Sequence, residues 1–420
     1  MRRSTAAQWA TRWPRTGADR AHLLDWSASA ALGGFSVGYQ VAVIAGALLS
    51  IRRDFGLGAG EQSLLVALLP LGAMFGSLLN SRIVGALGRR RTLILDATLF
   101  LAGTALEAVA PGYGVLVVAR ALLGFTVGST SSTAPVYLSE LAPPHARGRV
   151  VSVNQLLTTL GILSAYAVAY AFAGSGSWRA MFAVGAVPAL ALLLGMLRAP
   201  EAPATARAPR RLDLQALLRP ALRRPLLVAV ALGAIQQFSG INVVIYYAPS
   251  IMERAGFGTS NAILAAILVG AVNVAATLLA LPLVDRLGRR PLLLASLSGA
   301  FVSLALLGLS FVFPHSVGGS RLSLLSMLAF VVAFALGLGP VFWVMIGEIF
   351  PARERDAGAS VATATNWLSN FTAGVVFLPL VSAAGAGTTF WLFAAACAVG
   401  LVFAYRFVPE TKGRSLAAVP

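Results

Sequence analysis

The chain has 420 residues, of which 58% are apolar and only 11% are charged, and its mean hydropathy is +0.81. Soluble globular proteins carry roughly 25% charged residues, so this composition excludes an ordinary water-soluble enzyme and a disordered chain. The formal charge is nevertheless +17, from 32 basic and 15 acidic residues, and Lys412 is the only lysine. On so apolar a chain, the arginines indicate an orientation in a membrane rather than a nucleic-acid partner. Cys397 is the sole cysteine, which excludes an intramolecular disulfide.

Apolar segments long enough to cross a bilayer recur along the whole chain. A transmembrane helix needs about 20 predominantly apolar residues. Charged residues, glycines and prolines separate twelve segments of suitable length, so the sequence predicts an all-α membrane protein with twelve transmembrane helices. The expected spans lie near residues 24–50, 61–84, 92–110, 114–141, 150–174, 179–198, 225–255, 260–284, 292–313, 322–349, 358–383 and 388–407.

The basic residues predict how these spans are oriented. With the N-terminus on the cytoplasmic side, the tails and inner loops hold 23 basic residues and the outer loops hold five. This asymmetry follows the positive-inside rule, so both termini are expected in the cytoplasm and the protein in the cell membrane. The first apolar segment continues to Leu49, which disfavours a cleaved signal peptide. The segment 198–224, rich in proline and arginine, fits an inner linker better than a site for acidic lipid or RNA.

Three short motifs recur in the same order in the two halves of the chain. Each copy follows the corresponding span on the same side, and the copies are 200 to 209 positions apart. Such a repeat predicts two pseudo-symmetric bundles of six helices, with a substrate site between them near the midplane. The repeated motifs are 87–90 with 287–290, Glu140 and Arg147 with Glu348 and Arg355, and 200–201 with 409–410. The expected organisation is a cytoplasmic tail (1–23), a first bundle (24–198), a cytoplasmic linker (199–224), a second bundle (225–407) and a cytoplasmic tail (408–420).

Longer motifs stand at 38–44 (GYQVAVI), 135–140 (PVYLSE), 236–242 (QQFSGIN), 285–290 (DRLGRR), 343–351 (WVMIGEIFP) and 409–414 (PETKGR). With these motifs the chain resembles, along essentially its whole length, the sugar porter branch of the major facilitator superfamily. The resemblance implies a major facilitator fold and transport of a monosaccharide, a hexose or a pentose, by alternating access. It also implies a monomer in the lipid bilayer that is not an enzyme and uses no nucleic acid, cofactor or metal.

Uncharged polar side chains in the seventh span are candidates for substrate binding. Gln236, Gln237 and Asn242 are costly in an apolar helix unless they face a partner or a cavity. Their amides both donate and accept hydrogen bonds, as the hydroxyls of a sugar do. In a straight helix Gln237 and Asn242 would point about 140° apart. We therefore expect a bend or an unwound turn near Gly240.

The resemblance adds further residues to this expected site. It implies contacts from Gln155, Trp343 and Asn366, and weaker candidates are Asn273 and Trp367. Trp343 would offer an aromatic face to the apolar side of a sugar ring. Ile162 stands where the resemblance to bacterial proton–xylose symporters would place a second glutamine. Interhelical hydrogen bonding is the structural alternative for the glutamine pair.

Three residues bear on coupling to protons. Proton-coupled members of the family carry an aspartate directly after the Gly-Tyr of span one, where this chain has Gln40. Arg120, about 9 Å from the outer end of span four, corresponds to the arginine that pairs with the missing aspartate. Because a buried charge needs a partner, Glu107 near the outer end of span three is its expected counter-ion.

The remaining carboxylates are expected in loops, in tails or at span ends, with Asp96 at the beginning of span three. No proton carrier is then left at the midplane, which favours facilitated uniport with Glu107 and Arg120 as a structural pair. The alternative is a proton symporter in which Glu107 has taken over the coupling role. A sugar receptor and a drug antiporter are remote alternatives, because the tail after span twelve is short and the 236–242 motif is present.

A group of charged residues follows the even-numbered spans on the cytoplasmic side. Ion pairs among them are expected to bridge the two bundles when the inner gate is shut, whereas helix capping is the simpler alternative. In the first bundle, Gly85 and Ala86 stand at the positions equivalent to Asp285 and Arg286. This difference weakens the expected contribution of the first bundle to the gate. The candidate gating residues are Glu140, Arg147, Asp285, Arg289, Arg290, Glu348 and Arg355.

Overall fold

The structure is a computed structural model that describes residues 17–141, 147–200, 216–312, 317–351 and 354–412, and all regular secondary structure in this part is helical. The first bundle comprises α2 (Gly17–Asp54), α3 (Ala59–Leu87), α4 (Arg89–Ala108), α5 (Tyr113–Leu141), α6 (Arg147–Ala171), α7 (Trp178–Val184) and α8 (Ala186–Arg198). The second comprises α9 (Pro220–Phe238), α10 (Ile241–Arg254), α11 (Thr259–Leu287), α12 (Arg289–Ser310), α13 (Val317–Leu336), α14 (Leu338–Glu348), α15 (Arg355–Ala384) and α16 (Ala386–Phe407), preceded by the short 3-10 helix η1 (Ala216–Leu218).

These helices match the twelve predicted spans to within a few residues. Eleven described helical segments are long and apolar enough to cross a membrane, and the twelfth span is α4. Asp96 and Glu107 are both buried in this 20-residue helix, which also contains Arg89, Arg90 and Arg91, and these five charged residues lower its mean hydropathy. The predicted fold class is thus confirmed.

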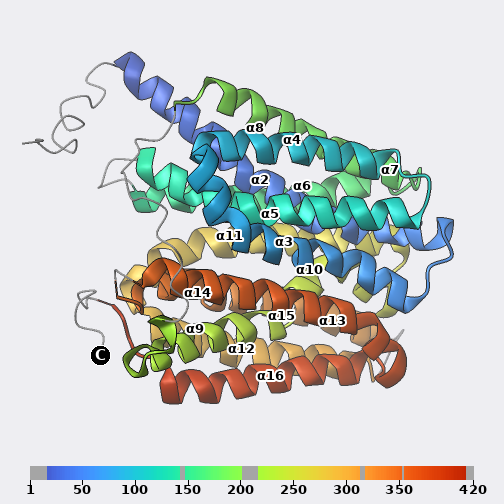
Figure 1. Cartoon of the computed structure of the whole chain (residues 1–420). Helices are drawn as coiled ribbons and strands as arrows, with labels where there is room; N and C mark the ends of the chain where they lie inside the picture. Colours follow the sequence, from blue (N-terminus) through green and yellow to red (C-terminus); the bar gives the residue numbers. More distant parts are fainter. Residues whose placement is uncertain (1–16, 142–146, 201–215, 313–316, 352–353, 413–420) are drawn as a thin grey trace, which may run out of the picture.

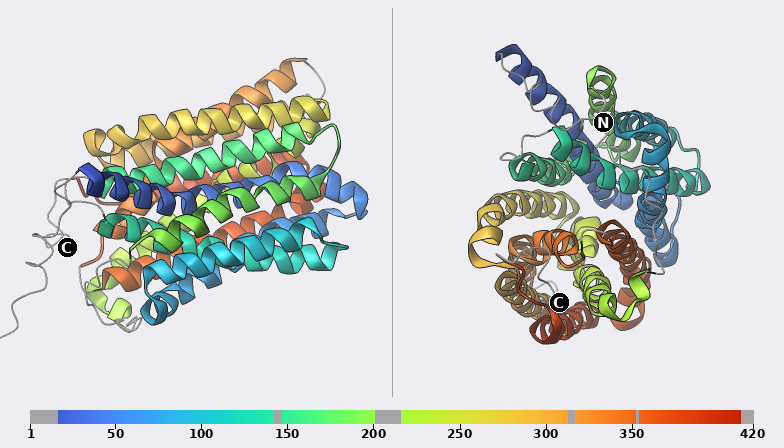
Figure 2. Two further views of the ribbon diagram at one scale, coloured as in Figure 1. Left: turned by 90° about the horizontal axis from the view of Figure 1, so that it is seen from above. Right: turned by 60° about the vertical axis from the view of Figure 1, so that its left-hand side comes forward.

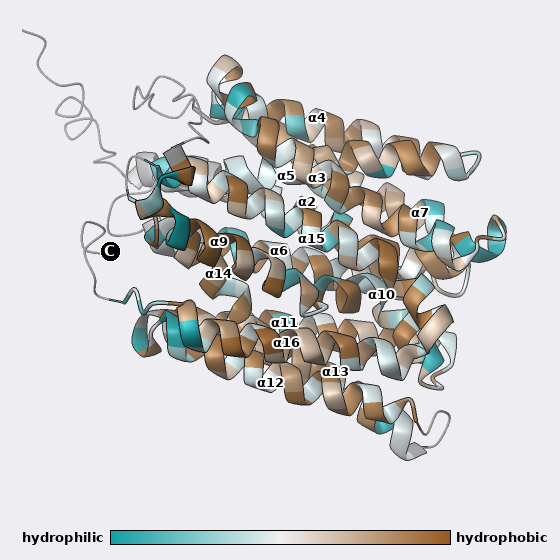
Figure 3. Cartoon of the chain, turned by 60° about the horizontal axis from the view of Figure 1, so that its bottom comes forward, coloured by the Kyte–Doolittle hydropathy of each residue, from teal (hydrophilic) through white to brown (hydrophobic). Residues whose placement is uncertain are grey.

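Two groups of roughly parallel helices lie side by side. In Figure 1 the blue and green helices of the first bundle lie above the yellow and red helices of the second, and the right-hand view of Figure 2 looks along them. Apolar residues cover most of their length in Figure 3. We call the end that carries Gly17 and Phe407 the tail end, and the end that carries Asp54 and Ala59 the far end.

Within the first bundle, α3 and α5 approach so closely that only glycine fits at the contact. A Cβ atom on Gly128 would collide with the carbonyl oxygen of Ala73, and one on Gly76 would collide with that of Phe125. Lipid removes the hydrophobic drive between helices, so van der Waals packing of small residues holds them together. Helices α3 and α5 therefore form a rigid pair.

Contacts between the bundles are formed by α2 with α10, α3 with α15 and α6 with α11. Hydrogen bonds and an ion pair join the bundles in the described part of the chain. Arg52 Nη2 lies 2.8 Å from Glu253 Oε2, Tyr166 Oη donates to the carbonyl of Ile245, and the amide of Leu378 donates to Ser63 Oγ. These contacts lie towards the far end.

The buried apolar residues of the described part form three clusters, whose positions follow the contacts between the bundles. One core contains residues of both bundles, among them Ile51 of the first and Ile251 of the second. At the tail end two separate cores exist instead: one around Tyr137 belongs to the first bundle, and one around Phe342 belongs to the second. The bundles are thus joined at the far end and independently packed at the tail end.

Two spans are interrupted where no interruption was predicted. Helix α7 ends at Val184 and helix α13 ends at Leu336, in each case four residues before a proline, Pro188 or Pro340. A proline has no N–H for the carbonyl four residues earlier. A glycine, Gly185 or Gly337, follows each helix end and forms the turn.

The predicted domain bounds remain predictions. Residues 1–16 of the first tail, 201–215 of the linker and 413–420 of the last tail lie outside the described residues.

Candidate functional site

The seventh span is broken at the predicted position. Helix α9 ends at Phe238 and α10 begins at Ile241, with Gly240 at φ +86° in the left-handed region. Glycine adopts this conformation without the steric penalty that a Cβ atom brings. Ser239 Oγ donates to the carbonyl of Gln236 over 2.7 Å, which satisfies a carbonyl group freed by the break.

The break brings the expected amides together in one buried cluster, which we call the amide cluster (Gln236, Gln237, Asn242 and Asn366). Asn242 Nδ2 donates to Gln237 Oε1 over 2.8 Å. Gln237 Nε2 donates to Asn366 Oδ1 over 3.0 Å, and Asn366 Nδ2 donates to Gln236 Oε1 over 2.7 Å. Residues on opposite faces of a straight helix therefore become neighbours because the chain turns at Gly240.

The amide cluster links α9, α10 and α15 to the interrupted tenth span. Gln236 Nε2 donates to the carbonyls of Leu338 and Gly339 over 3.0 and 3.2 Å, just after the break at Gly337. Two interrupted helices thus meet at these amides. Their side chains satisfy one another, so a polar ligand that enters can replace amide–amide bonds with its own.

The other residues implied by the resemblance lie outside this hydrogen-bonded cluster. Gln155 on α6 is exposed, and Asn273 on α11 is 9% exposed. Trp343 on α14 is 43% exposed and contacts the ring of Phe342 edge-on, with 4.9 Å between the ring centroids. Trp367 is buried, and within the described part of the chain its Nε1 atom has no hydrogen-bond partner. Ile162 is buried in the far-end core.

The expected pair of Glu107 and Arg120 is present and fully buried. Arg120 Nη1 lies 3.6 Å from Glu107 Oε1, and both side chains are 0% exposed. Arg120 Nη1 also donates to the main-chain carbonyl of Gln40 over 3.1 Å. The Gln40 side chain turns away and donates from Nε2 to Thr104 Oγ1 over 2.9 Å. Gln40 therefore contributes its backbone to Arg120, and Glu107 supplies the negative charge.

The pair is sparsely hydrogen-bonded. Among the described residues, neither carboxylate oxygen of Glu107 accepts a hydrogen bond, and Arg120 Nε and Nη2 donate none. Tyr246 and Tyr247 of the second bundle lie near enough to act electrostatically on Arg120. Asn370 Nδ2 donates to Tyr246 Oη over 3.1 Å, which connects this region to α15.

The expectation for Asp96 was wrong. Asp96 does not stand at the beginning of a span but inside α4, seven residues after Arg89, and it is 1% exposed. The turn before α4 consists of Gly88 alone, so the arginines that suggested a loop form the first turn of the helix. Ser129 and Thr130 of α5 donate hydrogen bonds to its carboxylate. Sequence reasoning missed this second buried carboxylate.

At the tail end, equivalent ion pairs occur in both bundles. Arg89 Nε lies 2.7 Å from Glu140 Oε2 in the first bundle, and Arg289 Nη2 lies 2.9 Å from Glu348 Oε1 in the second. Each pair joins helices of one bundle, and bridges between the bundles when the inner gate is shut stay a prediction. The first bundle keeps its pair although Gly85 replaces an acidic residue, and Arg89 was not among the predicted gating residues.

Arg290 repeats the role of Arg90. Arg90 donates to the carbonyls of Met196 and Leu197 at the end of α8, and Arg290 Nη2 donates to the carbonyl of Tyr405 at the end of α16 over 2.6 Å. Arg290 therefore ties helix ends within the second bundle.

The other predicted gating residues are Arg355, Arg147 and Asp285. Arg355 is half-buried at the beginning of α15, and its Nε and Nη2 atoms have no hydrogen-bond partner among the described residues. The side chains of Arg147 and Asp285 lie outside the described part of the structure.

The segment after α16 closes this end of the second bundle. Glu410 accepts hydrogen bonds from the backbone amides of Arg289 and Arg290 over 3.1 and 3.0 Å, and Thr411 Oγ1 donates to Glu348. Partial burial raises the pKa of Glu410, but hydrogen bonds from the backbone of Lys412, Arg289 and Arg290 outweigh it and hold the pKa below its usual value.

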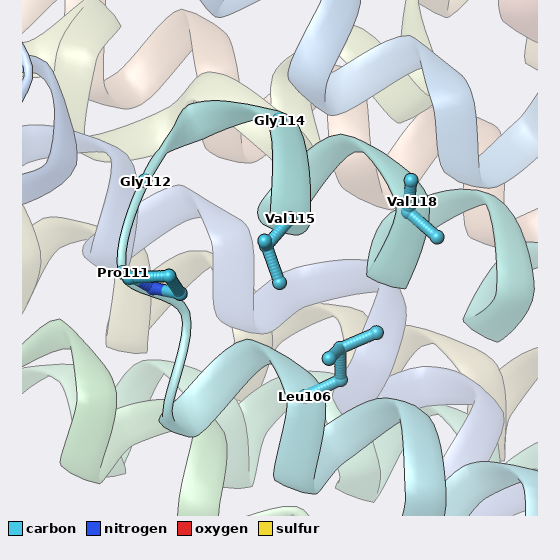
Figure 4. A pocket seen from close by; sticks show the side chains of 6 residues that line it. All are labelled: Leu106, Pro111, Gly112, Gly114, Val115 and Val118. Atoms are coloured by element: carbon cyan, nitrogen blue, oxygen red, sulfur yellow. The ribbon is translucent and has the colours of Figure 1, made fainter.

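A separate apolar pocket lies at the turn between α4 and α5 (Figure 4). Leu106, Pro111, Val115 and Val118 line it, and no charged side chain contributes. Val118 is 60% exposed, so this hollow opens on the surface of the molecule and is distinct from the amide cluster.

In the described residues, twelve helical spans in two bundles, eleven of them apolar enough to cross a membrane, with interrupted helices that meet at buried amides, define a multi-pass membrane transporter of the major facilitator type. The family model for the sugar (and other) transporters matches residues 26–216 and 204–420, and the chain belongs to this family.

Known relatives match over nearly the whole chain. The galactose-proton symporter of Escherichia coli (strain K12) is 37% identical over 423 residues, which cover 92% of this chain and 91% of the relative. The glucose transporter GlcP of Staphylococcus epidermidis is 33% identical over 421 residues, covering 93% and 94%. The xylose transporter XylE from E. coli, in a partially occluded inward open conformation, has a TM-score of 0.82 and 31% identity, covering 94% of this chain and 100% of that one.

Proposed function

We propose that this protein carries a monosaccharide across the cell membrane by alternating access. The observation that carries the proposal is the amide cluster at the break in the seventh span, where Gln236, Gln237, Asn242 and Asn366 converge. Interrupted helices at the interface of two bundles form the substrate sites of many transporters. The galactose, glucose and xylose transporters among the relatives support a monosaccharide as the substrate.

Both termini lie in the cytoplasm in this proposal, because the basic residues are concentrated in the loops and tails of the tail end. The shared core and the contact of Arg52 with Glu253 then close the extracellular side. The separate cores of the two bundles lie on the cytoplasmic side, where the substrate leaves or enters. This arrangement corresponds to an inward-facing state.

For coupling, the geometry supports proton symport through Glu107 better than uniport. A buried carboxylate with one ion contact at 3.6 Å and no hydrogen-bond donor is weakly held as an anion. When Glu107 takes up a proton, Arg120 keeps its bond to the carbonyl of Gln40. The named relatives include a galactose-proton symporter. Facilitated uniport, favoured by the amide at Gln40, remains the competing proposal.

Transport assays with purified protein in liposomes test both parts of the proposal, sugar transport and its coupling to protons. A panel of hexoses, pentoses and polyols in counterflow identifies the substrate, and lack of counterflow by every monosaccharide would refute sugar transport. An imposed proton gradient without a sugar gradient then tests coupling. Symport predicts accumulation of sugar, whereas a uniporter only equilibrates it.

A charge-swap series locates the coupling group. Glu107→Gln is expected to abolish accumulation and retain counterflow. Adding Gln40→Asp to this variant places a carboxylate on the residue whose backbone carbonyl accepts a hydrogen bond from Arg120, and it is expected to restore accumulation. Accumulation that survives Glu107→Gln would exclude Glu107 as the coupling residue.

A further inference from the structure

A second buried polar cluster lies within the first bundle, separate from the amide cluster. Ser129 Oγ donates to Asp96 Oδ2 over 2.9 Å, and Thr130 Oγ1 donates to the same oxygen over 3.1 Å. Asn80 on α3 completes the group, because its Oδ1 accepts from Thr133 Oγ1 over 2.8 Å. All five side chains are buried, and they come from three helices that are adjacent in Figure 1.

Asp96 lacks a cationic partner among the described residues. No arginine, lysine or histidine nitrogen there lies within 4.0 Å of its carboxylate. A carboxylate taken out of water without a cation is stabilised when it binds a proton. Among the side chains that the structure describes, the titratable and charged groups on its own helix and on the helices packed against it are Arg89, Arg90, Arg91 and Glu107 (α4), Glu61 and Arg82 (α3), Tyr113, Arg120, Tyr137 and Glu140 (α5), Arg198 (α8), Arg179 (α7), and Tyr39, Arg52, Arg53 and Asp54 (α2).

The nearest of these charges along α4 is already neutralised. Arg89 lies two turns from Asp96 on the same face of the helix, about 10 Å along its axis. Its guanidinium is engaged by Glu140 at 2.7 Å. Glu107 lies eleven residues away in the other direction and contacts Arg120. The immediate surroundings of Asp96 among the described residues are therefore hydroxyl and amide groups.

The Ser129 hydroxyl has two acceptors and one hydrogen. Its Oγ lies 2.9 Å from Asp96 Oδ2 and 3.3 Å from Asn80 Oδ1. The hydrogen serves Asp96 when the carboxylate is charged. If Asp96 is protonated, the new O–H donates to Ser129 Oγ, and the serine hydrogen turns to Asn80 Oδ1. Each protonation state thus has its own complete hydrogen-bond arrangement.

We propose that Asp96 is a proton-binding site whose occupancy sets the rate of transport, an inference that rests on the proposed function. A proton from water on the tail-end side binds Oδ2, and it returns to water when the site empties. In the charged state α5 is bound to α4 through Ser129, and in the neutral state Ser129 also binds α5 to α3 through Asn80.

This change acts on the helices that carry the coupling pair. Arg120 precedes Ser129 by nine residues on α5, and Glu107 follows Asp96 by eleven residues on α4. The proton on Asp96 therefore replaces a charged hydrogen bond between α4 and α5 by a neutral one and adds a bond from α5 to α3, and the distance between Glu107 and Arg120 depends on how α4 and α5 pack. Asp96 acts through this pair as a positioning residue.

A proton fits this cluster better than a metal ion does. Its oxygens already lie at hydrogen-bond distances of 2.8 to 3.3 Å from one another, with hydroxyl hydrogens between them. A bound sodium ion would require these oxygens to move apart, whereas a proton needs no additional space.

The test separates the proton on Asp96 from the proton on Glu107. Sugar counterflow is measured in liposomes with equal pH on both sides, from pH 5 to pH 9, for wild type, Glu107→Gln, Asp96→Asn and the double variant. We expect the counterflow rate of Glu107→Gln to keep one pH-dependent change, a limb of the pH–rate profile. We expect the double variant to lose this limb. Asp96→Asn mimics the neutral acid and is expected to match wild type at low pH and to differ from it about threefold or more at high pH. A limb that survives in the double variant would overturn the proposal.

A second measurement does not depend on transport. Infrared difference spectra between high and low pH are expected to contain the carbonyl stretch of a buried carboxylic acid that disappears in Asp96→Asn and persists in Glu107→Gln. If that band is unchanged in Asp96→Asn, Asp96 is only a structural acceptor. Counterflow that requires sodium at constant pH, and loses this requirement in Asp96→Asn, would show a metal site instead. If no sugar is transported, the proposed function fails, but the infrared result still decides whether Asp96 titrates.

Discussion

Arg52 of α2 and Glu253 of α10 form an ion pair between the two bundles, with 2.8 Å between Nη2 and Oε2. Glu253 also accepts a hydrogen bond from Thr259 at the beginning of α11. In the described part of the chain this is the only ion pair that joins the bundles, and it lies at the far end. In the proposed alternating-access cycle, opening of the far end breaks this ion pair.

Arg52→Gln is therefore expected to increase the outward-facing population. The side chains are 35% and 17% exposed, so we expect a change of about two- to fivefold, which corresponds to less than about 1 kcal/mol. Reactivity of a cysteine introduced at the exposed position 155 measures the inward-facing fraction, since Cys397 is buried. Arg53→Gln removes the same charge from the same helix end without breaking the pair. Equal effects of the two substitutions would show that net charge, and not the ion pair, sets the population.

Substitutions in the amide cluster are expected to weaken substrate binding. Gln237 connects Asn242 to Asn366 and also donates to Gln236, so Gln237→Ala removes three hydrogen bonds at once. We expect the KM for the transported sugar to rise about tenfold or more, because one hydrogen bond contributes roughly 1 kcal/mol. Gln62→Ala serves as the control, since Gln62 bonds the Leu57 carbonyl at the far end. An unchanged KM in Gln237→Ala would mean that the cluster only holds helices together.

The left-handed turn at Gly240 predicts a strict requirement for glycine. Gly240→Ala forces an L residue to φ +86° and places its Cβ 3.2 Å from the ring of Phe393. The expected loss of stability is about 1–2 kcal/mol, with displacement of Gln237 relative to Asn242. Thermal unfolding in detergent measures the first effect and sugar affinity the second. Gly60→Ala is the matched control, because no atom lies within 4 Å of a Cβ there; a similar loss in both variants would contradict the assignment.

The hydrogen bonds of Glu410 predict how the segment after α16 responds to acid. Its pKa is lower in the folded protein than in the unfolded chain, so its contribution to stability is complete above the unfolded value of about 4.3. The contribution is lost as the pH falls through the lower folded value. A spin label near Thr411 is expected to become mobile in acid, at a pH below the pKa of an unfolded glutamate. In Glu410→Gln the mobility is expected to be high at every pH, and an acid transition that persists in this variant would assign it to another carboxylate.

The sequence predicted the spans and the break at Gly240 because hydropathy and helix geometry act locally. The same local rule would have found the breaks at Gly185 and Gly337, since each glycine stands three residues before a proline. Pro70 shows that a proline without this glycine is not a sufficient signal for a break. Its helix α3 is unbroken, with Val66 and Ala67 where the broken spans have a helix end and a glycine.

The errors concern relations that spacing along the chain does not determine. Asp96 was assigned to a span end because a loop of ordinary length was expected after span two, whereas Gly88 alone makes the turn. The partners of the gating residues depend on which end of the molecule is closed, so bridges between the bundles stay a prediction for the state in which the tail end is shut. Because one sequence must fold into both the inward-facing and the outward-facing state of the proposed cycle, it does not indicate which state is populated.

The shared core at the far end has a thermodynamic consequence. Opening that end transfers apolar residues such as Ile51 and Ile251 from a packed interior into a water-filled cavity. Exposure of apolar surface to water raises the heat capacity. The equilibrium between the inward- and outward-facing states should therefore depend on temperature along a curved van 't Hoff plot, so that cooling and heating do not change the populations in proportion.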